Sequence, residues 1–176
     1  KAGSDLIETN TFNSNSISLS DYNLSKISYK LNFEGARLVR EAIKEENKEA
    51  YVVGSIGPTN KTASLSPDVT DPAARNIDFD ELVTNYKECI DGLLDGGSDI
   101  LMLETIFDSL NAKAGIFAYL TKCNELKKEI PFIISGTITD ASGRTLSGQT
   151  PEAFWTSLKH SNPSAIGFNC ALGAEQ

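Results

Sequence analysis

The feature that most restricts the fold of this chain is a regular alternation of short apolar runs with longer amphipathic stretches. The apolar runs predict strands at 5–12, 51–57, 100–105, 131–139 and 165–170. The stretches between them predict helices at 19–46, 78–95, 109–126 and 151–160. Most of the strand runs are apolar at consecutive positions, which is typical of a parallel sheet covered by helices. The sequence therefore predicts an α/β protein.

Two of the predicted strand units resemble each other. The sequences GSDLIET at 3–9 and GSDILMLET at 97–105 share a Gly, a Ser-Asp pair, an apolar strand and a terminal Glu-Thr. Repetition of one βα unit favours a barrel over a doubly wound open sheet. The open sheet would also be expected to carry GxGxxG after its first strand, and TNTFN at 9–13 does not. We therefore predict part of a TIM-type (β/α) barrel.

The size of a whole barrel places this prediction in context. An eight-unit barrel runs to about 250 residues. The 176 residues would supply about five of the eight βα units. The chain begins without Met, almost directly at a strand, and ends just after 165–170. We expect residues 1–176 to be an internal fragment of a single barrel domain.

Charge and composition exclude several classes of partner. The formal net charge of −8, with scattered Lys and Arg, argues against nucleic-acid binding. No apolar run approaches the roughly 20 residues of a membrane span, so no membrane partner is expected. The three cysteines, Cys89, Cys123 and Cys170, form no CxxC pair and suit a reducing cytoplasm. Small-molecule chemistry in the cytoplasm is the class that remains.

Chemistry in parallel α/β folds lies at the carboxyl ends of the strands, where loops vary freely. Cys170 ends the last apolar strand, and the alternative is a buried structural thiol. Glu104 follows four apolar residues directly, so its carboxylate needs a cationic partner or hydrogen-bond donors. A substrate ammonium would satisfy it, as would a neighbouring N–H or hydroxyl. Glu8 shares this context, but alternation leaves its direction undecided.

The remaining candidates have structural explanations. Cys89 and Cys123 fall within helical patterns, where packing is the default role. His160, the one histidine, comes late in a short helix before Asn162-Pro163, as is typical of a residue near free helix-end carbonyls. A Cys-dependent hydrolase would need a base near Cys170, and none is visible. No catalytic acid, base or nucleophile is assigned.

Several longer stretches carry a more specific signal. They are IETNTF at 7–12, GPTNKTASLSPDV at 57–69, LETIFD at 103–108, ISGTITDASGRTLSGQT at 134–150 and FNCALG at 168–173. Together they closely resemble the homocysteine-binding domain of cobalamin-dependent methionine synthases, in order and over essentially the whole chain. Betaine-type and S-methylmethionine-type homocysteine methyltransferases share the fold and the Asn-Cys strand end.

The resemblance implies a zinc-dependent methyl transfer to homocysteine. The family holds zinc with three cysteine thiolates, and Cys170 matches the first of them. The other two form an adjacent pair, which is expected beyond residue 176. The resemblance assigns Glu104 to the homocysteine ammonium and places Asn169 and Thr11 in the substrate site. The zinc-bound thiolate would take a methyl group from methylcobalamin to give methionine, with cobalamin-binding and folate-binding modules supplied by the same parent protein.

Two alternatives remain open. The chain could be part of a cobalamin-independent homocysteine S-methyltransferase that uses betaine or S-methylmethionine. It could also be an inactive structural fragment, because one thiolate cannot make a three-thiolate zinc site and missing strands leave open sheet edges.

Overall fold

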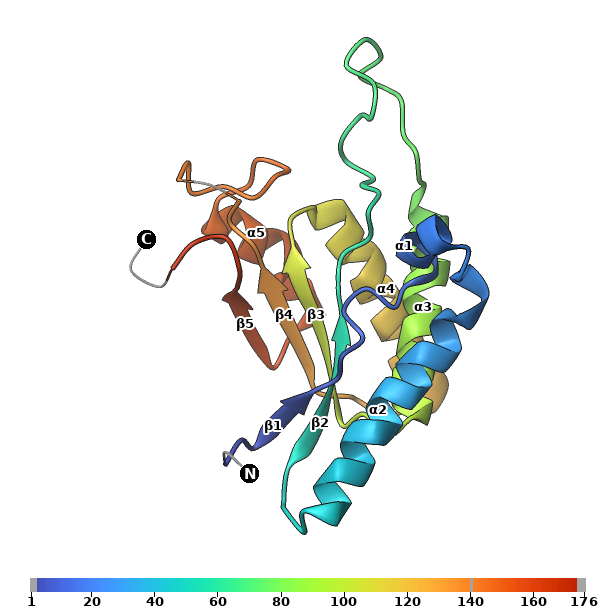
Figure 1. Ribbon diagram of the computed structural model, residues 1–176. Coiled ribbons are helices and arrows are strands. Elements are labelled where there is room, and N and C mark those ends of the chain that lie inside the picture. The colour runs from blue at the N-terminus through green and yellow to red at the C-terminus, as the bar shows by residue number, and fades with distance from the viewer. Residues whose placement is uncertain (1–2, 140, 174–176) are drawn as a thin grey trace.

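The computed structural model describes residues 3–139 and 141–173, so Asp140 in the predicted loop 140–150 lies outside the described residues. The strands and helices alternate along the chain (Figure 1). The strands are β1 (Leu6–Glu8), β2 (Tyr51–Ile56), β3 (Ile100–Ile106), β4 (Phe132–Gly136) and β5 (Ala165–Phe168). The helices are α1 (Ser16–Leu19), α2 (Ser28–Glu45), α3 (Phe79–Asp95), α4 (Ser109–Leu126) and α5 (Pro151–Leu158).

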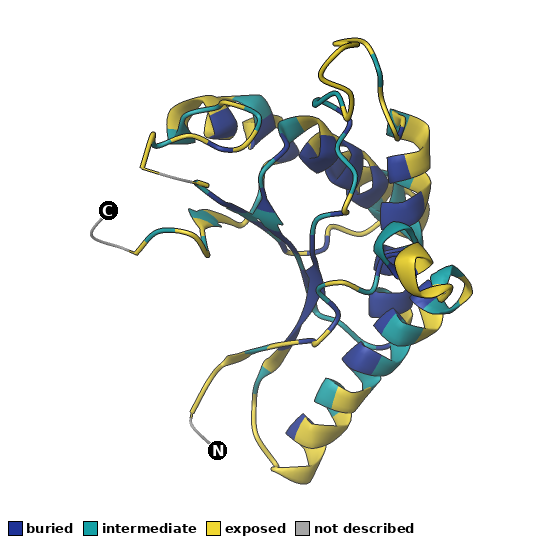
Figure 2. Cartoon of the chain, turned by 45° about the horizontal axis from the view of Figure 1, so that its top comes forward, coloured by how far each residue is buried: buried dark blue, intermediate teal, exposed yellow. Residues whose placement is uncertain are grey.

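The five strands form one parallel sheet in the order β1-β2-β3-β4-β5. This order follows the sequence without a reversal, and the helices cover one face of a curved sheet (Figure 2). A doubly wound sheet would reverse its strand order and carry helices on both faces. The α/β prediction is confirmed, and the arrangement is that of part of a TIM-type barrel. Among the described residues the sheet does not close, and β1 and β5 are its two edges.

The two faces of the sheet differ in what they bury. Leu101, Leu103 and Ile106 of β3 belong to the hydrophobic core between the sheet and the helices. We call the opposite face, which would line the interior of a barrel, the inner face. On that face Ile100 and Met102 are only partly buried, since no layer of described residues covers them.

Local sequence signals explain where the helices begin. Asp78 caps α3 by accepting from the N–H of Glu81, and the Glu81 side chain accepts in turn from the N–H of Asp78. Thr150 caps α5, and Pro151 occupies its first turn, where a missing N–H costs nothing. These helix starts agree with the sequence prediction.

The predicted helix over 19–46 is wrong in its first part. Two 3₁₀ turns, Ser20–Tyr22 and Ser25–Ile27, precede α2, and Asn23 between them is left-handed with φ 59°. Ser, Asp and Asn side chains favour turns over helix interiors because they compete for backbone hydrogen bonds. The continuous helix therefore begins only at Ser28.

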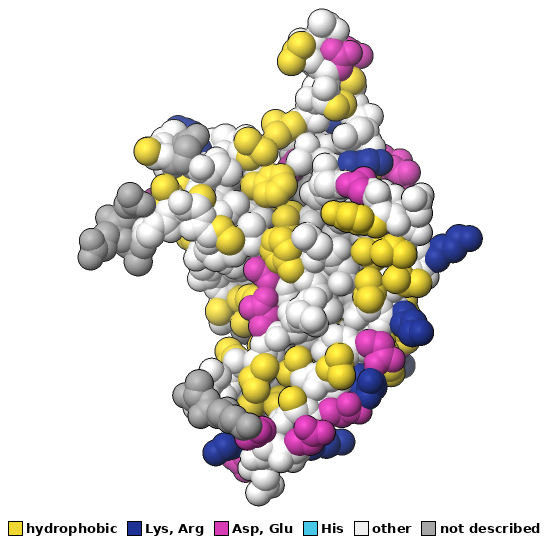
Figure 3. All heavy atoms as spheres, viewed as in Figure 1, with side chains coloured by type: hydrophobic (Ala, Val, Ile, Leu, Met, Phe, Trp, Pro, Cys, Tyr) yellow, Lys and Arg dark blue, Asp and Glu magenta, His cyan; other side chains and the backbone are white. Residues whose placement is uncertain are grey.

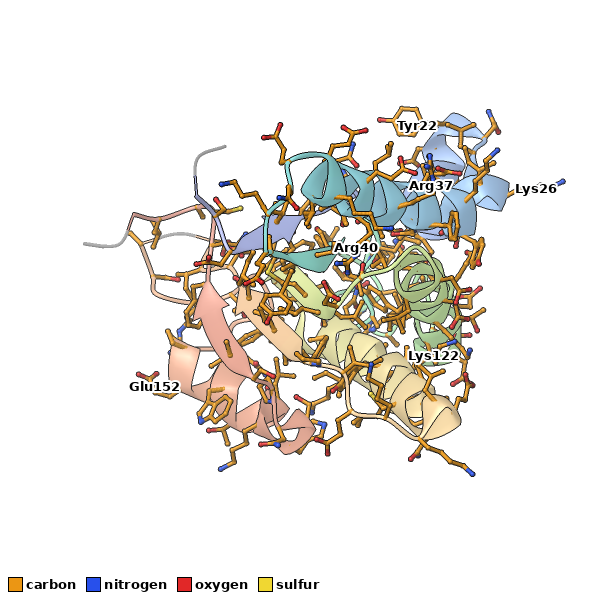
Figure 4. The ribbon with its side chains drawn as sticks, turned by 90° about the horizontal axis from the view of Figure 1, so that it is seen from below. Tyr22, Lys26, Arg37, Arg40, Lys122 and Glu152 are labelled. Atoms are coloured by element: carbon orange, nitrogen blue, oxygen red, sulfur yellow. The ribbon has the colours of Figure 1, made fainter. Side chains whose placement is uncertain are left out.

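The amino ends of the strands are tied to α2 by Arg40. Its guanidinium pairs with the Asp99 carboxylate at 2.6 Å and also donates to the Gly97 carbonyl. The second strand joins this cluster because the Val52 N–H donates to Asp99. Figure 4 shows Arg40 beside the sheet, while Lys26 and Lys122 lie on the outer side of the helices.

The long loop between β2 and α3 rises above the sheet in Figure 1, and its base is fixed to α4. Asp108 caps α4 and also accepts hydrogen bonds from the N–H and hydroxyl of Ser64. Asn111 accepts from the Ala63 N–H and donates to the Lys61 carbonyl. The outer part is solvent-exposed, with Val69 fully so. Across the described residues, no helix is both long enough and apolar enough to span a bilayer.

Candidate functional site

The inner face carries one polar residue from each strand unit near its carboxyl end. These residues, which we call the polar layer, are Glu8, Ser55, Glu104, Ser135 and Asn169. Glu8 pairs in register with Val53, two positions before Ser55, and Ser55 pairs with Met102, two positions before Glu104. This displacement of two residues per strand is the stagger of tilted strands in a barrel. It brings these residues to the same level along the barrel axis.

A β-bulge in β3 turns two consecutive side chains toward the inner face. The register of β3 with β4 shifts between Leu103 and Ile106, both of which lie in the helix-side core. In a regular strand Glu104 and Thr105 would point to opposite faces, whereas the extra residue of a bulge re-aims a side chain. Thr105 adopts φ 54°, an uncommon backbone conformation for a β-branched residue. Strain of this kind gathers at functional sites.

Glu104 is buried and accepts hydrogen bonds from both sides. Its Oε1 accepts from the Ser55 hydroxyl at 2.5 Å, and its Oε2 lies 3.3 Å from the Thr105 hydroxyl. Among the described residues no Lys or Arg side chain forms an ion pair with this carboxylate. The hydrogen-bond donors to Glu104 are therefore hydroxyl groups. Among the described residues no cationic side chain is paired with its carboxylate on the inner face.

Asn169 connects the thiol to the bulge. Its Nδ2 donates to the Thr105 hydroxyl at 2.7 Å and to the Cys170 sulfur at 3.1 Å. Its Oδ1 accepts from the Ser135 hydroxyl at 2.8 Å and from the Thr105 N–H. The backbone carbonyl of Asn169 accepts from the Thr137 hydroxyl. Asn169 thus lies where three strands end.

Cys170 is solvent-exposed, and its backbone is left-handed with φ 64°. Its sulfur lies 3.7 Å from the Thr105 hydroxyl, one residue from Glu104. The alternative of a buried structural thiol describes Cys89 instead, where burial raises the pKa of the thiol to about 12. Glu104, Asn169 and Cys170 therefore lie together at the carboxyl ends of the strands, as expected from the sequence.

Thr11 lies apart from these three residues. It is 2% exposed, and its hydroxyl donates to the Ser55 carbonyl at 2.7 Å. Thr9 joins this contact, since its hydroxyl bonds Thr11 and accepts from the Ser55 N–H. The predicted strand 5–12 is correspondingly short, because after Glu8 the chain attaches to β2 through these side chains. Thr11 supports the strand that carries Ser55.

Glu8 shares the inner face with Glu104. Figure 3 shows acidic side chains near the middle of the molecule, among hydrophobic ones. Glu8 lies on the same face of the sheet as Ser55 and Glu104, one strand away from Ser55 and two strands away from Glu104. Partial burial raises the pKa of Glu8 to about 7, helped by the negative charge of Glu104. The acidic residues of the two repeated units therefore lie on the same face of the sheet.

Sequence reasoning missed three members of the site: Ser55, Thr105 and Ser135. Ser55 and Ser135 each interrupt an apolar strand, and that interruption was an available signal. Thr105 gave no comparable signal, because its orientation depends on the bulge. His160 lies in a 3₁₀ turn, Lys159–Ser161, at the end of α5.

A sequence model of the family described as homocysteine S-methyltransferase matches residues 1–176. The chain belongs to the homocysteine S-methyltransferase family. Solved structures agree on the fold of this family member. The metallated form of the Escherichia coli homocysteine methyltransferase MmuM has a TM-score of 0.75 at 20% identity, over 99% of this chain and 60% of that one. Its oxidised form gives 0.72 at 19% identity, over 96% of this chain and 58% of that one.

The apo form of MmuM gives a TM-score of 0.69 at 20% identity, over 99% of this chain and 59% of that chain. The family member described here thus spans about 60% of the length of the structures it matches. Within the part of the chain that the structure describes, no three His, Cys, Asp or Glu side chains gather where they could hold a metal ion. One thiolate does not by itself satisfy the four-coordinate preference of zinc.

Proposed function

We propose that this chain is the homocysteine-binding part of a methyltransferase that forms methionine. The observation that carries the proposal is the distance relation at the end of β3: a buried carboxylate, Glu104, adjoins Thr105, whose hydroxyl lies 3.7 Å from the exposed Cys170 sulfur. Homocysteine has an ammonium group at one end and a thiol at the other. A fixed negative charge beside a sulfur site matches those two groups.

In this proposal Glu104 binds the ammonium group. The carboxylate is held by the hydroxyls of Ser55 and Thr105, so it is oriented before the substrate arrives. A buried carboxylate gains most from a cation that replaces its lost hydration. Asn169 contributes to the substrate site by fixing the edge between Thr105 and Cys170. Thr11 acts indirectly, because its hydroxyl donates to the Ser55 carbonyl and so holds the strand that carries Ser55.

The proposed reaction moves a methyl group to the homocysteine sulfur. The thiol loses its proton, the sulfur forms a bond to the methyl carbon, and the bond between that carbon and the donor breaks with its electron pair on the donor. Zinc chemistry would favour the thiolate, because a metal ion deprotonates a coordinating thiol. We propose Cys170 as one zinc ligand. Among the described residues no further ligands gather beside Cys170 to complete such a site.

Methylcobalamin is the donor that we propose, delivered by cobalamin-binding and folate-binding modules of the parent protein. The support is the likeness of the segments at 57–69 and 134–150 to cobalamin-dependent methionine synthases. The three free thiols suit a reducing compartment such as the cytoplasm. Transfer from S-methylmethionine or betaine is the second candidate, favoured by the fold shared with MmuM. An inactive fragment is the third, since one thiolate holds zinc weakly.

A donor competition assay on the full-length protein tests the proposal. The protein, loaded with zinc, is given homocysteine and one of three donors: methylcobalamin, S-methylmethionine or betaine. Methionine is then quantified by mass spectrometry. We expect methionine from methylcobalamin only. Methionine from either of the other donors would transfer the proposal to the second candidate, and its absence with all three would overturn the proposed function.

A further inference from the structure

The Thr105 hydroxyl lies between the two ends of the proposed substrate site. Its oxygen is 3.3 Å from the Oε2 of Glu104 and 3.7 Å from the sulfur of Cys170. The Nδ2 of Asn169 donates to the same oxygen at 2.7 Å. Thr105 therefore contacts both the carboxylate and the thiol, and its position determines how these two groups lie relative to each other.

The polar groups of Thr105 are fixed by their hydrogen bonds. A hydroxyl has one hydrogen to donate. Because Asn169 donates to the Thr105 oxygen, that hydrogen is available to Glu104 or to Cys170. The carboxylate is the nearer acceptor and the stronger one, so the hydroxyl is oriented toward Glu104. The Thr105 N–H is held as well, since it donates to the Asn169 Oδ1.

The backbone conformation of Thr105 is unfavourable for its residue type. A φ of 54° lies in the left-handed region, which glycine adopts freely and a β-branched residue rarely does. Glycine would relieve the strain but would carry no hydroxyl. The hydrogen bonds to Asn169 offset the strain in part. The presence of Thr at this position is therefore explained by its hydroxyl and not by its backbone preference.

We infer that Thr105 is a positioning residue that sets the spacing between the ammonium site at Glu104 and the sulfur site at Cys170, and that this spacing selects homocysteine over cysteine. This inference rests on the proposed function and extends it to the length of the substrate side chain. Homocysteine has one more methylene group than cysteine between its amino-bearing carbon and its sulfur. A cysteine bound to Glu104 through its ammonium group would leave its sulfur short of Cys170.

The test uses four forms of the full-length, zinc-loaded protein. Wild type has both the hydroxyl and the β-branch, Thr105→Ser has only the hydroxyl, Thr105→Val has only the β-branch, and Thr105→Gly has neither. Calorimetry gives the Kd of homocysteine and of cysteine for each form. Wild type and Thr105→Ser should bind homocysteine about tenfold or more tightly than cysteine. In Thr105→Val and Thr105→Gly homocysteine should bind about tenfold more weakly, with the Kd of cysteine changed less than about twofold.

The ratio of the two Kd values separates positioning from a merely structural role, which would change both affinities together. Thr84→Val is the matched control, because the Thr84 hydroxyl donates to the Asp80 carbonyl on α3, and this variant should keep both wild-type affinities. Thr105→Gly covers the case in which Thr105→Val does not fold, since glycine accepts a positive φ.

Three results would overturn the spacing role and leave the proposed function intact. They are equal affinity of wild type for homocysteine and cysteine, an unchanged preference for homocysteine in Thr105→Gly, and loss of that preference in Thr105→Ser. Failure of wild type to bind homocysteine would overturn both the spacing role and the proposed function.

Discussion

Asn169 and Thr105 hold each other across the strand ends through two hydrogen bonds. The Asn169 Nδ2 donates to the Thr105 hydroxyl at 2.7 Å, and the Thr105 N–H donates to the Asn169 Oδ1 at 3.2 Å. The pair joins residues from β3 and from the segment after β5, which are not neighbouring strands. It places the sulfur of Cys170 beside the bulge that directs Thr105 inward next to Glu104. The position of the Cys170 thiol relative to the Glu104 carboxylate therefore depends on the side-chain amide of Asn169.

Replacing Glu104 with Gln tests the ammonium site. Glu104→Gln keeps the shape of the side chain but removes the charge, so homocysteine KM should rise about tenfold or more. Steady-state kinetics of the full-length protein give the answer. Glu152→Gln is the matched control, because Glu152 is exposed on α5 at the outer edge of the molecule (Figure 4). An unchanged KM in Glu104→Gln would remove this residue from the substrate site.

Replacing Asn169 with Asp tests its action on the thiol. Asn169→Asp loses the N–H donor to the Cys170 sulfur and places a negative charge beside it. The thiolate should become less favourable, so the pH at which Cys170 reacts half-maximally with iodoacetamide should rise. Ser135→Ala removes only a donor to the Asn169 Oδ1 and should change this pH little. Identical pH profiles for wild type and Asn169→Asp would show that the amide does not tune the thiol.

The three cysteines should react with an alkylating reagent in the order of their solvent exposure. Cys170 is exposed and should be alkylated first in chelator-treated protein, whereas Cys89 is buried with a pKa of about 12 and should react last. Peptide mass spectrometry at increasing times gives the order. Zinc should slow the alkylation of Cys170 and leave Cys123 unaffected. Complete reactivity of all three in guanidinium serves as the control, and early modification of Cys89 would contradict the structure.

The Asp108 carboxylate should matter to stability through the long loop. Asp108→Ala removes the cap of α4 and the acceptor for Ser64, so we expect a loss of about 2 kcal/mol. Thermal unfolding gives the stability, and limited proteolysis should cut residues 58–77 faster. Asp68→Ala in the exposed part of the loop is the control, with an expected change within about 0.5 kcal/mol. Equal unfolding curves for the two variants would contradict this role.

Glu8 should also make stability depend on pH. Its pKa rises from 4.5 to about 7 on folding, so the folded state holds the proton more tightly than the unfolded state. The stabilisation is complete below pH 4.5 and is lost as the pH rises through 7. Glu8→Gln should therefore raise the Tm at pH 8 and leave it unchanged at pH 4.5. A Tm difference that is the same at both pH values would exclude this linkage.

Several parts of the fold and site followed from sequence alone. Consecutive apolar residues marked the strands, and amphipathic stretches marked the helices at 78–95 and 109–126, because both signals are local. Glu104, Asn169 and Cys170 were expected close together because each lies at the end of a predicted strand. The carboxyl ends of parallel strands meet on the same side of a sheet. The structure confirms that they lie close together. Their roles toward homocysteine and zinc stay predictions.

Other parts were decided only by the tertiary structure. The bulge turns Thr105 inward beside Glu104, the strand stagger brings Glu8 to the same height, and Thr11 is buried against β2. None of these follows from local periodicity, because alternation fixes which residues share a face but not how far one strand is displaced against the next. That displacement is fixed by the backbone pairing of the strands, in which Glu8 pairs with Val53 and Ser55 with Met102. The sequence therefore determined which residues lie at the carboxyl ends of the strands, and the register between the strands decided which of these residues are in contact.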